Sequence, residues 1–230
     1  MSSFFIDELM RRQVIPEVFK SVPTVAVPTI NNDSLDTLKV LKEAIRCFDK
    51  EIISRAFFRS FKIAKNVLVK GQKNYLVPRE SIYDTELNRI LVNWIVKQNS
   101  YEVISQWHMI ENHVGEKDKH YYSDIIIKKL SQTIIIELLA TSTKSTLSEQ
   151  FSRVLKYADN LSASEIWIIH FTCEDNATLK PHYPLNNEEF ERLNIVHFLH
   201  NEKFDKVQMS AQLKNTFDVI TYINNEQIIP

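Results

Sequence analysis

Two carboxylates stand in apolar surroundings where an ordinary core strand carries none. Asp124 precedes the run IIIKKL, and Glu137 lies inside the run TIIIELLAT. Both runs are short and rich in isoleucine, which is typical of buried strands. A buried carboxylate is costly unless it is protonated, paired or bound to a metal. The pair therefore indicates a shared cation, either Mg²⁺ or Mn²⁺, because these ions prefer oxygen ligands.

The geometry of a hairpin would bring the two carboxylates together. Only a short turn, LSQ over residues 130–132, joins IIIKK to TIIIELLAT, so we expect an antiparallel hairpin with Asp124 and Glu137 at one end of a sheet. The backbone carbonyl of Leu138 would add a third oxygen. A metal at such a site lowers the pKa of a bound water and stabilises charge on a phosphodiester. Two alternatives remain open, with Asp124 as a turn cap or Glu137 as the partner of Arg153 in a structural ion pair.

The elements around these residues predict an α/β protein with a mixed, partly antiparallel central sheet flanked by helices. Apolar residues at helical spacing predict helices over 35–69, 82–97 and 147–161. Alternating or continuous apolar runs predict strands over 101–110, 121–129, 133–141, 165–171 and 194–200. The tail to Pro230 is mixed. We expect a basic helical extension over residues 1–75 and a core with C-terminal additions over residues 76–230.

The order of helix, three strands, helix and strand resembles the core of the PD-(D/E)XK, or restriction-endonuclease-like, nucleases. Asp124 matches the family's Asp, and Glu137 matches its (D/E). The resemblance implies that Glu86, on the helix before the strands, supports a metal held by Asp124, Glu137 and Leu138. It further implies that Gln150 and Tyr157, on the helix after the strands, position the site.

One position departs from that family. Its motif places a lysine two residues after the acid, where this chain has Leu139. Another basic residue would have to supply the charge, and the candidates are Lys144, Arg153 and Lys156. Arg153 ranks first, because its spacing places it on the same helix face as Gln150 and Tyr157.

A narrower resemblance carries an expectation about where the protein works. The combination ELLAT…KYADNLSASEIWIIHFT is similar to C-terminal domains of Crinkler-type fungal effectors. The resemblances imply a Mg²⁺-dependent deoxyribonuclease, acting as an effector in the nucleus. The alternative, which Leu139 favours, is a nuclease-like fold that no longer cleaves and serves as a nucleic-acid-binding or protein-interaction module.

Composition excludes several other classes of function. Net charge is −1 and there are only two glycines, which leaves no glycine-rich phosphate loop and argues against a nucleotide cofactor. The same scarcity argues against a serine hydrolase. The spacings of His108, His113 and His120 do not match zinc ligands. Cys47 and Cys173 suggest buried thiols in a reducing compartment.

Partners and compartment follow from local charge and hydropathy. Between Lys39 and Lys73 there are ten Lys or Arg and three acids. This basic segment is either a flank that contacts phosphates or the solvated face of helices. DNA is the expected partner, RNA is compatible with the same residues, and a homodimer is compatible with the sequence. We expect no secretion signal and no transmembrane segment, hence a cytoplasmic or nuclear protein.

Overall fold

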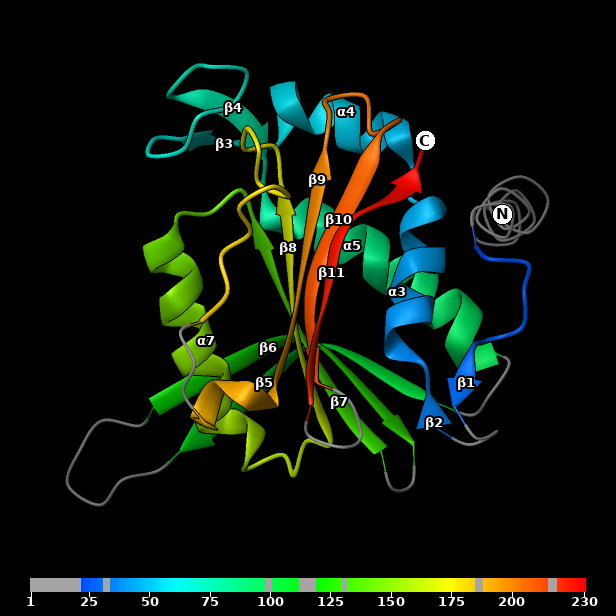
Figure 1. Cartoon of the computed structure of the whole chain (residues 1–230). Helices are drawn as coiled ribbons and strands as arrows, with labels where there is room; N and C mark the ends of the chain where they lie inside the picture. Colours follow the sequence, from blue (N-terminus) through cyan, green and yellow to red (C-terminus); the bar gives the residue numbers. More distant parts are fainter. Residues whose placement is uncertain are drawn as a thin grey trace, which may run out of the picture.

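A seven-stranded mixed sheet forms the centre of the molecule (Figure 1). The computed structural model describes residues 22–30, 34–97, 101–111, 119–129, 132–184, 188–214 and 219–230. In spatial order the strands are β11 (Ile220–Ile229), β10 (Val207–Lys214), β9 (Leu193–His200), β8 (Glu165–Thr172), β7 (Gln132–Ala140), β6 (Lys119–Lys129) and β5 (Glu102–Glu111). The pairs β7–β8 and β8–β9 are parallel and the other neighbours are antiparallel. The prediction of an α/β protein with a mixed, partly antiparallel sheet is confirmed.

Helices and two small hairpins complete the described chain. The helices are α3 (Thr37–Arg46), α4 (Lys50–Arg59), α5 (Glu80–Leu91) with a π-helical continuation over Val92–Val96, α7 (Lys144–Ala158) and a 3-10 helix over Glu188–Arg192. The hairpins pair β1 (Thr29–Ile30) with β2 (Ser34–Leu35) and β3 (Phe61–Ala64) with β4 (Tyr75–Pro78). Along the chain, α5 therefore precedes the antiparallel strands β5, β6 and β7, and α7 leads from β7 to the parallel strand β8.

Alternation along the strands divides the core between two helical layers. On β7, Ile134, Ile136 and Leu138 belong to a buried cluster that includes residues of α3 and α5. Ile135 and Leu139, on the opposite face, belong to a second cluster with α7. This period of two is the expected consequence of strand geometry. Figure 1 shows the same division, with α7 and α3 on opposite sides of strands β8 to β10.

The predicted helix over 35–69 is wrong in its last third. It is two helices, and β3 follows α4 directly. The β3–β4 connection turns at Lys70 and Gly71, whose φ angles are 53° and 71°. Asp175 stabilises this turn by accepting both backbone N–H groups, at 2.9 and 2.7 Å. The sequence pattern could not show this support, because Asp175 lies about a hundred residues away.

The first turn of α7 also differs from the prediction. The helix begins at Lys144 rather than Leu147, with Thr143 as its N-cap. The Thr143 hydroxyl accepts the backbone N–H of Thr146 at 3.2 Å, which satisfies one of the free donors of the first turn.

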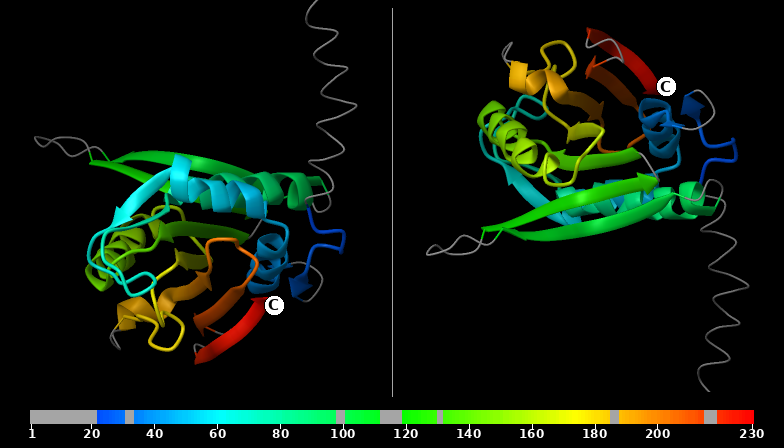
Figure 2. Two further views of the ribbon diagram at one scale, coloured as in Figure 1. Left: turned by 90° about the horizontal axis from the view of Figure 1, so that it is seen from above. Right: turned by 90° about the horizontal axis from the view of Figure 1, so that it is seen from below.

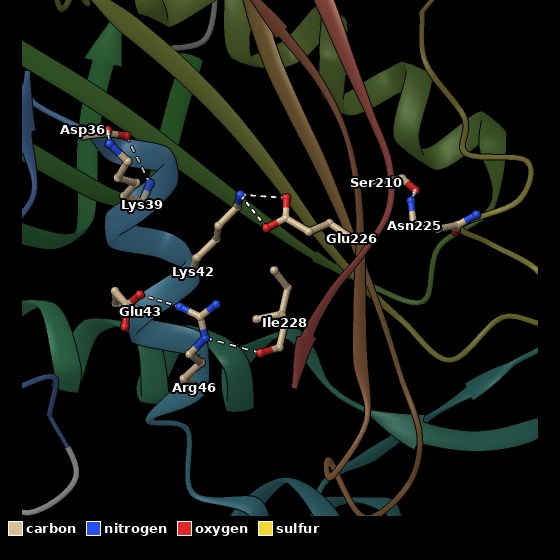
Figure 3. Close-up of polar contacts among 9 residues, drawn as sticks. All are labelled: Asp36, Lys39, Lys42, Glu43, Arg46, Ser210, Asn225, Glu226 and Ile228. Carbon is tan, nitrogen blue, oxygen red and sulfur yellow. Dashed lines mark hydrogen bonds and ion pairs between the residues drawn. The ribbon is translucent and has the colours of Figure 1, made fainter. Parts of the chain in front are cut away.

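Several residues of the predicted basic flank are engaged within the fold. Lys42 Nζ contacts both carboxylate oxygens of Glu226 on β11, at 2.7 and 2.8 Å (Figure 3). Arg46 donates to the carbonyl of Ile228 at 3.3 Å and pairs with Glu43. Further pairs of the same kind are Lys39–Asp36, Arg55–Glu51 and Lys70–Glu202. These pairs reduce the net positive charge that the segment presents to a polyanion.

Two strands occupy the mixed C-terminal tail. β10 is largely buried, whereas β11 lies at the edge of the sheet and is exposed along most of its length. No helix in the described ranges is both long and apolar enough to cross a membrane.

Candidate active site

The strands β6 and β7 separate at the point where Asp124 lies. Their pairing runs from Lys129↔Gln132 to Ile125↔Ile136 and ends there. Asp124 comes next, and its Oδ2 accepts the backbone N–H of Leu138 at 2.7 Å. The Asp124 carboxylate thus accepts the N–H that would otherwise form the next backbone hydrogen bond between β6 and β7. Since the N–H and C=O of one strand residue point to the same side, the Leu138 carbonyl also faces this fork.

Glu137 lies in the α7-facing layer and is almost completely buried. Its side chain is 1% exposed, and Gln150 Nε2 donates to its Oε2 at 2.7 Å. Arg153 Nη2 lies 3.8 Å from the same oxygen, and the Tyr157 and Ser123 hydroxyls also favour its charged form. Burial and the nearby charge of Asp124 nevertheless raise the pKa of Glu137 to about 8.

Three buried oxygens around this carboxylate lack a hydrogen bond within the described residues. They are Oε1 of Glu137 and the hydroxyl oxygens of Tyr157 and Ser123. Buried polar atoms in proteins are nearly always paired, so either the two hydroxyls donate to Glu137 directly or ordered water or an ion joins them.

Two carboxylates that the sequence reasoning missed join the site from the first turns of α5. Burial and then the charge of Asp124 raise the pKa of Glu80 to about 7 and that of Asp84 to about 6. The two acids are one helical turn apart and therefore share a face. This i, i+4 spacing was available in the sequence, but the predicted helix began at residue 82.

Lys62 is the second residue that sequence reasoning did not single out. It lies on β3, and its Nζ donates a hydrogen bond to the Ala140 carbonyl at the end of β7. Burial lowers the pKa of Lys62, while the nearby carboxylate of Glu80 opposes this shift. The β3–β4 hairpin thus places an ammonium group one residue from Leu139, whose own side chain packs against α7.

Of the three basic residues predicted from the sequence, Arg153, Lys144 and Lys156, only the first lies near the carboxylates. The Arg153 side chain is 59% exposed, and its charge acts on Asp124, Glu137 and Glu80. Lys144 instead acts on Glu174 and His182, beyond the start of α7. Lys156 is exposed in the last turn of α7. Of the three candidates named from sequence, the structure places Arg153 beside the carboxylates.

Glu86 has contacts that differ from those expected for a metal-proximal acid. Its buried carboxylate accepts the backbone N–H of Asp49 at 2.9 Å and pairs with Arg89 at 2.8 Å. These bonds join the start of α4 to α5. The two acids that face Asp124 from α5 are Glu80 and Asp84, and Glu86 holds the helices together.

Replacing Glu86 should therefore reduce stability without a specific effect on activity. Glu86→Ala leaves the Asp49 N–H and Arg89 without their acceptor, so we expect a loss of about 2 kcal/mol in the free energy of unfolding. Urea denaturation measures this loss, and Glu149→Ala, an exposed acid on α7, is the control. Unchanged stability of Glu86→Ala would show that these hydrogen bonds do not hold the two helices together.

The raised carboxylate pKa values predict how stability depends on pH. In the folded state, Glu137 and Glu80 remain protonated above about pH 5, where the same side chains of the unfolded chain are already ionised. Their stabilising contribution is full at low pH and is lost as pH rises through about 7 and 8. The free energy of unfolding should thus fall by about 2 kcal/mol between pH 6.5 and 8.5 without divalent metal.

Most of the opposing effect of the buried histidines lies below this window. Burial lowers the pKa of His197 and His200 to about 4, so their contribution changes mainly below an unfolded-state pKa of about 6.5 and is complete near pH 7.5. Thermal melts of wild type and Glu137→Gln at pH 6.5 and 8.5 check the prediction. The variant should lose less stability, and an identical loss in both proteins would contradict it.

The buried histidines of the parallel strands form a continuous hydrogen-bonded chain. His170 accepts the Ser142 N–H at 3.0 Å, its other ring nitrogen lies 3.0 Å from Nδ1 of His197, and His197 Nε2 lies 3.0 Å from the His182 carbonyl. They border a cavity of about 490 Å³ that Lys144 and Lys180 also line. Because each ring nitrogen has a partner, this group serves as core structure at the ends of β8 and β9.

His108 and His120, considered above as zinc ligands, lie together on β5 and β6, whereas His113 is outside the described residues. Within the described residues, no three His, Cys, Asp or Glu side chains are grouped so that they could hold a metal ion. A cation at the fork would therefore depend on two carboxylates, a backbone carbonyl and water.

Comparison of the chain with protein-family models, with curated proteins and with solved structures finds no match.

Proposed function

We propose that this protein is a metal-dependent nuclease that hydrolyses phosphodiester bonds of DNA, with a PD-(D/E)XK-like core. The observation that carries the proposal is the almost completely buried Glu137 carboxylate beside Asp124. A chain gains nothing in stability from two such carboxylates in one place, since each raises the cost of ionising the other. A site that binds a cation accounts for both.

The donor set fits Mg²⁺ or Mn²⁺. Asp124, Glu137 and the Leu138 carbonyl would hold the ion, and Glu80 and Asp84 would accept hydrogen bonds from its waters. Mg²⁺ normally keeps several waters and binds through one or two carboxylates, so the proposal asks only Asp124 and Glu137 to supply side-chain ligands. When bound, the metal would supply a water of lowered pKa and stabilise charge on the phosphate.

The remaining residues have separate roles in the proposal. Gln150 holds Oε2 of Glu137 through the 2.7 Å hydrogen bond, and Tyr157 packs beside it, so both position the carboxylate. Lys62, which lies at the end of β7 and near Glu80, would take up a proton from the attacking water or donate one to the phosphate. Arg153 has an exposed guanidinium and would contact a phosphate of the DNA backbone.

The second candidate function is a fold that binds nucleic acid without cleaving it. Leu139 favours it, because the lysine of the family motif is absent from β7. That function predicts DNA binding that does not depend on Asp124, whereas the nuclease predicts metal binding that does.

Cleavage of supercoiled plasmid and of single-stranded DNA tests the proposal. Each substrate is incubated with Mg²⁺, with Mn²⁺ and with chelator, and Mn²⁺ binding is measured separately by calorimetry. We expect cleavage only with metal and one bound Mn²⁺ that Asp124→Asn removes. Folded protein that binds DNA but neither cuts nor binds Mn²⁺ would support the second candidate function.

A further inference from the structure

The β5–β6 hairpin carries three aromatic rings with nearly parallel planes on one face. The His108 and Tyr122 rings are 4.5 Å apart with an interplanar angle of 5°. The His108 and His120 rings are 5.0 Å apart with an angle of 12°, and a 2.8 Å hydrogen bond joins their nitrogens. Tyr122 therefore stacks on one face of His108, whereas His120 lies beside His108 in nearly the same plane, because a hydrogen bond between ring nitrogens runs along the ring planes.

This face of the hairpin is exposed. Tyr122 is 57% exposed, and both histidines are exposed as well. The opposite face packs inward, where Tyr121 contacts Tyr157 of α7 at a ring distance of 6.0 Å. Figure 2 shows the paired strands extending outward from the rest of the sheet. Single exposed aromatic residues are common, but three parallel exposed rings form an organised platform.

The stack leads to the candidate active site. On β6, Tyr122 precedes Asp124 by two residues, about 7 Å along the strand. The alternation of faces breaks here, because Tyr121 packs with the α7 cluster whereas Ile125 packs in the opposite cluster. Tyr122 is the ring nearest to Asp124. On the partner strand, Gln106 stands opposite Asp124 with a φ angle of 51°, and the pairing is interrupted there without a change of register, between Ser105↔Ile125 and Trp107↔Ser123.

We propose that this ring stack is a platform for an unpaired base of single-stranded DNA, with Tyr122 as the ring that receives the base. The proposal rests on the proposed function and names its substrate class. A base that stacks on Tyr122 continues an existing set of parallel rings, and its backbone then passes the carboxylates at the fork. Such stacking is the usual mode of binding single strands without sequence preference. A base inside a duplex has both of its faces covered and is not available.

Binding of a fluorescent single-stranded thymidine oligomer, measured by anisotropy in chelator, tests this inference. We expect Tyr122→Ala to bind about tenfold more weakly, the loss typical of one base–aromatic stack. Tyr122→Phe keeps the ring and should stay within about twofold of wild type. Tyr222→Ala removes a tyrosine of similar exposure, 53%, on the opposite edge strand β11, and should also bind like wild type.

A duplex of the same length provides the second comparison. Wild type should prefer the single strand, and Tyr122→Ala should lose most of that preference. Wild type that does not bind the single strand, or Tyr122→Ala that binds it as wild type does, would overturn the inference. Because the assay contains chelator, its result is independent of cleavage. A chain that binds through Tyr122 but never cuts would refute the nuclease and keep the platform.

Discussion

Glu137→Gln should lower the rate of metal-dependent DNA cleavage by at least about a thousandfold while the protein becomes more stable at pH 8. A loss of about 4 kcal/mol of transition-state stabilisation corresponds to a thousandfold, which is within the range that a catalytic metal contributes. The amide oxygen of the introduced glutamine could still accept the hydrogen bond that Gln150 donates to Oε2, so the local packing should be retained. Because burial and Asp124 raise the pKa of Glu137 to about 8, its neutral replacement relieves a buried charge.

Asp124→Asn should have a comparable effect on cleavage. The amide oxygen of the variant can accept the Leu138 N–H as Oδ2 does, which keeps the fork between β6 and β7 in place. Plasmid cleavage and urea denaturation on the same preparations separate activity from stability. Glu149→Gln, an exposed acid on α7, is the control. Full activity of Glu137→Gln would show that the carboxylate is not part of the reaction.

The central part of this arrangement was predictable because it depends on short-range regularities. The isoleucine runs on either side of LSQ specify a hairpin, and the hairpin places Asp124 beside β7. Helical spacing placed Gln150, Arg153 and Tyr157 on one face of α7, and all three lie beside Glu137. Each of these relations follows from a period of two or of 3.6 within one element or between adjacent strands.

The parts that could not be predicted depend on long-range contacts. Lys62 reaches Ala140 only because the β3–β4 hairpin folds back, and Asp175 stabilises the turn of that hairpin from a distant loop. The apolar residues before Lys62 have helical spacing, so the local pattern favoured continuation of the helix. The exposed edge strand β11 has little hydrophobic pattern, since only its last two residues are buried.

Lys62→Met should reduce cleavage by about a hundredfold, because it removes a half-buried ammonium group that bonds to the carbonyl one residue after the position of the missing motif lysine. Proton transfer or charge stabilisation by one side chain commonly contributes that much or more. Burial lowers the pKa of Lys62, which brings its neutral form closer to physiological pH. We therefore expect the pH dependence of cleavage to change along with the rate, whereas a purely structural lysine would leave its shape intact.

A matched control for this prediction lies on the same hairpin. Lys65 is exposed after β3, and Lys65→Met changes the net charge equally, so it should cleave as wild type does. Lys62→Arg should recover part of the activity, since it keeps a positive charge near Glu80. If Lys62→Met cleaves normally and Arg153→Met does not, the charge comes from α7, as the sequence alone suggested. If both variants cleave normally, neither residue replaces the lysine, and Leu139 marks a site that works without one.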